Sequence, residues 1–128
     1  MDSTFRPRAV AFDPVAFQFL EAYLDSFVKW DVLHFFYHHA HAVNTAEAVA
    51  LAINRDSATV ARELHELAEA GVLQETQLGE VQVYALSNDP EISAGLRAFI
   101  EAATQDEFRY RAVFHLVRGR SWREQTYE

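Results

Sequence analysis

The sequence predicts a mainly helical fold of the α+β class, in which one two-stranded hairpin interrupts a series of helices. Apolar residues recur at helical spacing over most of the chain, helix-capping residues precede several of these stretches, and one short segment alternates in polarity. Half of the 128 residues are hydrophobic and 13% are aromatic, which is enough to bury a compact core. The length favours a single domain that spans residues 1–128.

The first two predicted helices cover residues 14–26 and 27–41. Asp13 and Pro14 are typical of a helix start, because the aspartate accepts hydrogen bonds from free amides and proline fits the first turn. The second helix is apolar on a broad face, so we expect it to be central to the core. Three of its aromatic residues are interpreted as core residues: Trp30, Phe35 and Phe36.

Two shorter helices follow in the middle of the chain. Asn44 or Thr45 can cap a helix over residues 46–53, whose alanines allow close packing. A fourth helix starts at Ser57 and ends at Gly71, since glycine readily adopts the conformation that follows a helix.

A hairpin and two more helices complete the chain. Alternating polarity predicts a strand over residues 81–86, which pairs with residues 74–77 across a short turn. Helical spacing returns within residues 90–118, where the second helix covers residues 105–116. Residues 119–128 lack periodicity, and no element is predicted for them.

Large apolar residues recur in both flanking segments, residues 14–26 and 90–118. Helices added to both ends of a small core need a surface against which to pack. The simplest arrangement is a two-fold pair of chains joined through these segments. We therefore expect a homodimer.

The middle of the chain resembles the DNA-binding core of bacterial winged-helix regulators of the ArsR and MarR kind. The strongest likeness is in residues 57–73, SATVARELHELAEAGVL, which resemble the recognition helix and following turn of those families. Residues 30–36, WDVLHFF, look like their first core helix, and residues 45–50, TAEAVA, look like their second. Residues 83–87, VYALS, are similar to the strand that closes their wing. The resemblance implies a winged helix-turn-helix over residues 27–88.

The resemblance also implies a transcriptional regulator whose fourth helix enters the major groove of double-stranded DNA. Short side chains at the start of this helix permit close approach to phosphate, and arginine can reach a base edge or a phosphate. The residues expected to contact DNA are Ser57, Thr59, Arg62 and His65, with Arg55 anchoring the preceding turn on a phosphate.

Charge supports an alternative from another functional class. The chain has 11 basic and 19 acidic residues, which give a net charge of -8, and its predicted hairpin holds no basic residue. The segment from Phe27 to Ser87 contains eight acidic residues but only three basic ones, Lys29, Arg55 and Arg62. Because neutralising phosphates supplies much of the affinity for DNA, the alternative is an acidic winged-helix module that binds a basic protein instead.

A histidine-rich stretch raises the question of a metal site. His34, His38 and His41 recur at i, i+4 and i+7, a spacing that can hold zinc, nickel or copper through imidazole nitrogens. No cysteine or acidic residue completes the set locally. We therefore expect exposed or interface histidines, with pH sensitivity as a milder alternative, and no metal.

Catalysis and membrane insertion have no support in the sequence. It holds no glycine-rich phosphate loop, nucleophile elbow or zinc-hydrolase signature, so neither an enzyme nor a cofactor is expected. Residues 1–8 lack the apolar run of a signal peptide, and no stretch approaches the ~20 apolar residues that cross a bilayer. A cytoplasmic protein is the resulting expectation.

Overall fold

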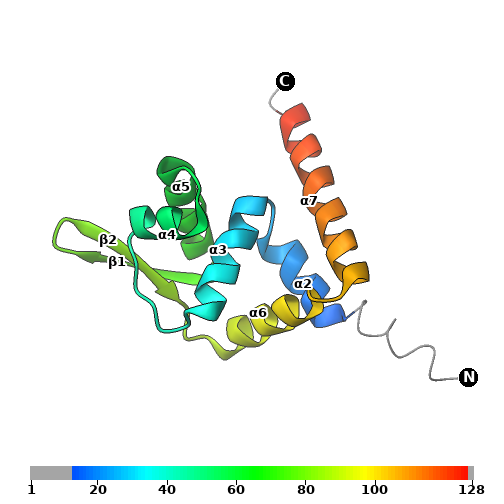
Figure 1. The fold of residues 1–128 in the computed structure, drawn as a ribbon, viewed down its shortest axis with the longest axis horizontal. Coiled ribbons are helices and arrows are strands. Elements are labelled where there is room, and N and C mark those ends of the chain that lie inside the picture. The colour runs from blue at the N-terminus through cyan, green and yellow to red at the C-terminus, as the bar shows by residue number, and fades with distance from the viewer. Residues whose placement is uncertain (1–12, 127–128) are drawn as a thin grey trace, which may run out of the picture. The chain divides into compact units, whose positions relative to one another are not determined.

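The computed structural model describes residues 13–126, and their side chains as far as residue 118. This part of the chain is mainly helical with one two-stranded antiparallel sheet, which confirms the α+β prediction (Figure 1). In chain order the elements are α2 (Pro14–Tyr23), α3 (Phe27–His38), α4 (Ala46–Ile53), α5 (Ser57–Glu69), β1 (Leu73–Leu78), β2 (Val81–Leu86), α6 (Pro90–Ala102) and α7 (Asp106–Thr126). Of these helices, none combines the length and apolar character that crossing a membrane requires.

The chain divides into two compact units. The central unit, Phe27–Ser93, contains α3, α4, α5 and the hairpin. The flanking unit combines the sequence up to Ser26 with that from Ala94 onward, and so contains α2, most of α6 and α7.

The central unit is built from three helices and the hairpin. Helix α5 contacts α3, α4 and β1, while α4 also contacts α3 and β2. The hairpin pairs residue for residue from Leu73 with Leu86 to Leu78 with Val81. Each helix contributes fully buried apolar side chains to the shared core, among them Val32, Leu33, Phe36, Val49, Val60 and Leu64. Phe36 is a core residue, as predicted.

The same core contains a buried ion pair. Lys29 on α3 is only 4% exposed, and its Nζ atom lies 2.6 Å from Oε1 of Glu63 and 2.5 Å from Oε1 of Glu66. Glu63 is also 4% exposed. Because burying a charge without a partner is strongly unfavourable, these contacts require the glutamates of α5 to face α3.

Capping residues explain where the helices of the central unit begin. Thr45, rather than Asn44, caps α4, because its hydroxyl accepts a hydrogen bond from the third helical amide at 3.1 Å. Ser57 is the first helical residue of α5, and the preceding Asp56 caps it by accepting from the Thr59 amide at 2.9 Å. Asn54 adopts the left-handed conformation that closes α4, with φ 59°.

Three predicted boundaries are wrong. Helix α2 ends at Tyr23 rather than 26, because Leu24 is extended and buried. Helix α3 ends at His38 rather than 41, since the His39 imidazole hydrogen-bonds the Phe35 carbonyl and the His39 amide turns to the Phe36 carbonyl. Helix α7 continues to Thr126, through a tail for which no element was predicted, because extending an existing helix is easier than starting one.

Aromatic packing holds the flanking unit together. The rings of Phe17 and Phe108 are 4.9 Å apart, and Phe99 lies about 6 Å from both Phe19 and Phe108. On α6, a Cβ atom added to Gly95 would come within 2.8 Å of Phe19 Cδ1. Glycine therefore allows α6 to approach α2 closely, although it destabilises the helix by roughly 1 kcal/mol relative to alanine.

Replacing Lys29 by methionine preserves side-chain volume but removes the ammonium group that contacts the buried carboxylate of Glu63 at 2.6 Å. We expect the free energy of unfolding to fall by about 3–5 kcal/mol, measured by urea denaturation. The double variant Lys29→Met with Glu63→Leu removes both charges and should regain most of this loss. Equal losses in the single and double variants would show that charge pairing is not the reason.

Candidate functional site

Helix α5 has two clearly different sides. Its inner side, Val60, Glu63, Leu64 and Leu67, is buried in the central unit. We define the outer face of α5 as Ser57, Ala58, Arg62 and His65, which are all exposed. Three of the five residues predicted to contact DNA therefore lie together on one surface.

Arg62 is the cation on this face that is most open to solvent. Its side chain is 65% exposed, and Nη2 lies 3.6 Å from Oε2 of Glu63, which is beyond a good hydrogen bond. The guanidinium can therefore turn toward a ligand without breaking a strong internal contact.

His65 is held between two carboxylates. Its Nδ1 lies 3.1 Å from Oε2 of Glu75 on β1, and its Nε2 lies 3.3 Å from Oε2 of Glu69 on α5. The hydrogen bond and charge of Glu75, followed by the charge of Glu69, raise the pKa of His65 above its ordinary 6.5. Protonation therefore adds positive charge to the outer face more readily than it would for an isolated histidine.

Glu75 joins His65 to the second strand of the hairpin. The Tyr84 hydroxyl donates to Glu75 Oε2 at 2.6 Å, and this bond, followed by that to His65, lowers the pKa of Glu75. Burial and then the bond to Glu75 raise the pKa of Tyr84 to about 12. The Tyr84 backbone also pairs with Asn44 in both directions, at 2.8 and 3.0 Å. The hairpin is thus tied both to α5 and to the segment before α4.

Thr59 and Arg55 are engaged by neighbouring carboxylates. The Thr59 hydroxyl donates to Asp56 Oδ2 at 3.0 Å, and the half-buried side chain lies beside the outer face. The Thr59 amide, followed by this hydroxyl, lowers the pKa of Asp56. Arg55, in the turn between α4 and α5, donates from Nε to Asp31 Oδ2 on α3 at 2.7 Å.

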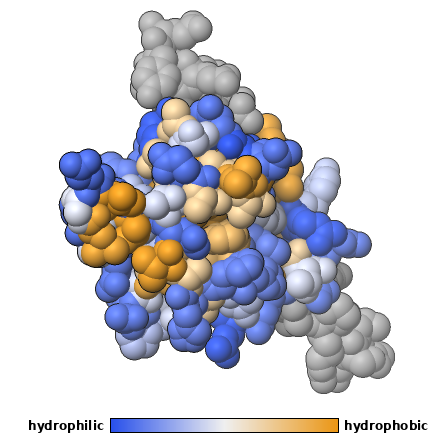
Figure 2. Space-filling view, turned by 60° about the vertical axis from the view of Figure 1, so that its left-hand side comes forward, coloured by the Kyte–Doolittle hydropathy of each residue, from blue (hydrophilic) through white to orange (hydrophobic). Residues whose placement is uncertain are grey.

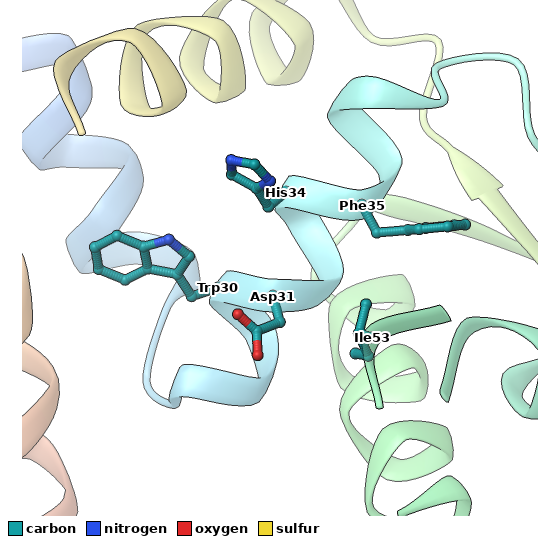
Figure 3. A pocket seen from close by; sticks show the side chains of 5 residues that line it. All are labelled: Trp30, Asp31, His34, Phe35 and Ile53. Carbon is teal, nitrogen blue, oxygen red and sulfur yellow. The ribbon is translucent and has the colours of Figure 1, made fainter. Parts of the chain in front are cut away.

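A shallow pocket of about 450 Å³ lies between α3 and α4 (Figure 3). Its lining residues are Trp30, Asp31, His34, Phe35 and Ile53. In Figure 3, Trp30 and Phe35 extend from α3 in different directions, with Asp31 between them. Both aromatic side chains are half-buried, so the prediction that they are core residues is wrong: they line an open surface.

The histidine stretch does not form a common ligand set in the described part of the chain. His34 and His38 lie on α3 with ring centroids 4.5 Å apart, whereas His41 follows the end of the helix. Their three imidazoles do not come close enough together to ligate one ion. Partial burial and then His38 lower the pKa of His34, against a smaller opposing effect of Asp31.

The tip of the hairpin is apolar and acidic. Leu78 and Val81, which pair across the turn, are 56% and 47% exposed, and Glu80 lies between them. Figure 2, in which the hairpin end of Figure 1 is turned forward, shows hydrophobic residues reaching the surface among hydrophilic ones. A second shallow pocket, of about 500 Å³, separates the end of α5 from β1 and includes Glu69 and Glu75.

No protein-family model matches this chain, and neither a curated protein nor a solved structure matches it. A functional assignment therefore depends on the central unit itself. Its most distinctive surface is the outer face of α5, together with the hairpin to which His65 connects it.

Proposed function

We propose that the central unit is a winged helix-turn-helix, and that the chain is a homodimeric transcriptional regulator that binds double-stranded DNA. The order of elements supports this assignment, since three helices precede a two-stranded hairpin and a short turn at Asn54 joins α4 to α5. In such modules the second helix of the motif enters the major groove. Helix α5 takes that role here.

The observation that carries the proposal is the orientation of α5. Glu63 and Glu66 turn toward Lys29, so two of the three glutamates of this helix are paired with an internal cation. The outer face instead offers Ser57, whose short side chain permits close approach, and the exposed guanidinium of Arg62. An arginine in the major groove can donate two hydrogen bonds to guanine.

His65 adds a charge that depends on pH. Its protonated ring offsets the carboxylates of Glu69 and Glu75, which are the acidic groups in contact with it. Arg55 lies in the turn that precedes α5, where its Nε donates to Asp31, and the remaining N–H donors of its guanidinium can contact a phosphate. Two copies of α5 in a dimer would read half-sites about 34 Å apart.

A second candidate is an acidic winged-helix module that binds a basic protein. It is favoured by the hairpin tip, where exposed Leu78 and Val81 flank Glu80 and no basic residue occurs in either strand. Wings that track the DNA backbone need positive charge, whereas an apolar tip with an acidic rim suits a protein surface.

Arg62→Ala tests the assignment of α5 to the major groove. We expect the affinity for a preferred genomic DNA fragment to fall roughly 5- to 150-fold, which corresponds to the ~1–3 kcal/mol of a bidentate arginine contact. Fluorescence anisotropy over a series of salt concentrations measures this loss. Arg97→Ala is the matched control, because Arg97 is also exposed but lies on α6.

Two outcomes would contradict the DNA proposal. Equal effects of the Arg62 and Arg97 substitutions would show that α5 does not make the contact. Absence of wild-type binding even at low salt would favour the protein-binding candidate, which is then tested with basic peptides and a Leu78→Glu variant.

His65→Gln tests the connection between α5 and the hairpin through the pH dependence of thermal unfolding. Because contacts with Glu75 and Glu69 raise the pKa of folded His65, its stabilising contribution is complete below the ordinary value of 6.5. That contribution is lost as pH rises through the raised pKa. We therefore expect the substitution to lower Tm more in mildly acidic than in alkaline buffer.

The pH window has a lower limit set by Glu75. Its pKa is lowered from 4.5, so its contribution is present above 4.5 and lost as pH falls through the lowered value. Measurements between these limits compare His65→Gln with His41→Gln, which alters an exposed histidine beyond α3. A pH-independent difference for His65→Gln would refute the contribution of the ion pairs.

A further inference from the structure

The pocket between α3 and α4 is formed by residues of the central unit alone. Its volume of about 450 Å³ is in the range of small-molecule sites. In Figure 3, the Asp31 carboxylate lies between Trp30 on one side and Phe35 with Ile53 on the other. His34 follows Asp31 by three residues, a spacing that places both on one side of α3. The lining thus combines one carboxylate with aromatic, aliphatic and imidazole groups.

Asp31 gives this pocket its charge. No lysine or arginine is among the described residues that line it. Oδ2 of Asp31 accepts from Arg55 Nε at 2.7 Å, whereas Oδ1 accepts no hydrogen bond from the described residues. The Asp31 side chain is 42% exposed, so a ligand can reach it. The remaining acceptor favours a ligand that has a positively charged N–H donor.

The His34 imidazole is uncharged at neutral pH. Burial, followed by the neighbouring His38, lowers the pKa of His34 below its ordinary 6.5, and the opposing effect of Asp31 is smaller. A neutral imidazole adds no charge that would repel a cation, and one of its nitrogens accepts a hydrogen bond. His34 therefore offers a second acceptor in the pocket.

A metal ion fits this pair of residues less well than an organic cation. Among the described residues, no third histidine or carboxylate lies within ligating distance of both Asp31 and His34. One oxygen of Asp31 is already engaged by Arg55. Zinc sites in proteins generally use at least three protein ligands, so two side chains are too few.

The aromatic wall formed by Phe35 is held in place by its neighbours. Its ring stacks on that of His39, with centroids 4.6 Å apart and an interplanar angle of 23°, and it meets Phe36 edge-on at 5.2 Å. Ile53, the last residue of α4, adds an aliphatic surface to the lining. Aromatic rings attract both other rings and cations, and a preformed wall lowers the entropy lost on binding. The pocket therefore suits an apolar ring joined to a cationic group.

We propose that this pocket binds a small primary amine that carries an aromatic ring. The ammonium group pairs with Oδ1 of Asp31, and the ring packs against Phe35 and Ile53. Because the ammonium shares the Asp31 carboxylate with Arg55, binding also weakens the hold on the turn that precedes α5. The site does not depend on DNA binding, and its test is performed without DNA.

Three probes that share one phenyl ring and differ in their polar group test this ligand class on the wild-type chain. Phenethylamine is expected to bind with a Kd of roughly 1 mM, as suits so small a compound. The neutral 2-phenylethanol and the anionic phenylacetate should bind at least about tenfold more weakly, because neither can form the charged pair with Asp31. Titration of the full chain followed by NMR measures each Kd. Absence of saturable binding by the amine, or equal binding of the alcohol, would overturn the proposal.

Two substitutions test the two halves of the pocket. Asp31→Asn removes the charge with little change in size and should weaken the binding of phenethylamine roughly 10-fold or more. Phe35→Leu leaves the pair of Asp31 with Arg55 in place and should weaken it roughly threefold or more through loss of the aromatic face. Glu101→Gln is the matched control for charge, since it removes one carboxylate from an exposed position of α6 and should leave Kd unchanged. Equal losses for Asp31→Asn and Glu101→Gln would show only a general attraction to an acidic chain and would refute the site.

The Nε–H group of Arg55 reports the position of the ammonium group. Because this group donates to Asp31, its NMR signal should shift as phenethylamine saturates the pocket. The same concentration of 2-phenylethanol should leave the signal in place. A signal that does not respond to saturating amine would show that the ammonium does not contact Asp31, and would overturn the assignment.

Discussion

The buried ammonium group of Lys29 constrains much of the central unit. A lysine excluded from water needs a carboxylate partner, and Glu63 and Glu66 provide two from consecutive turns of α5. Such pairs add little net stability, because desolvation offsets much of their attraction, but mispairing them is severely unfavourable. Their main effect is therefore on geometry: they fix which side of α5 faces α3, and so which residues face solvent.

This internal pairing changes how the acidic composition bears on function. Lys29 is used in the core, Arg55 is bound to Asp31, and His65 lies between two carboxylates, whereas the Arg62 guanidinium is directed to solvent. Few cations are thus available to neutralise phosphates. Any recognition of DNA by α5 would depend more on particular base contacts than on general attraction to the backbone, and the hairpin would contribute position rather than charge.

Local signals predicted the fold better than they predicted its surfaces. The start of α4 follows from a threonine cap, which is a local signal. The bounds of β2 agree with the stretch predicted from alternating polarity, although its two buried residues, Val83 and Tyr84, are adjacent rather than alternating. The end of α3 depends on a hydrogen bond between the His39 imidazole and the Phe35 carbonyl, which would otherwise bond a backbone amide of the helix. The spacing of apolar residues in the sequence does not reveal this bond. Lys29 lies 34 and 37 residues from its partners, so no pattern within one helix revealed the pair. The link from His65 through Glu75 to Tyr84 likewise exists only once the hairpin packs on α5.

The division of α5 into two sides has a consequence for how this protein can evolve. Residues that hold the helix in place, such as Glu63 and Leu64, are buried, while Ser57 and Arg62 make little contribution to the core. Substitutions on the outer face can therefore change the chemistry of this exposed surface without disturbing the scaffold. A single ancestral framework could acquire new binding preferences by a few exposed changes, provided that Lys29 kept its carboxylates.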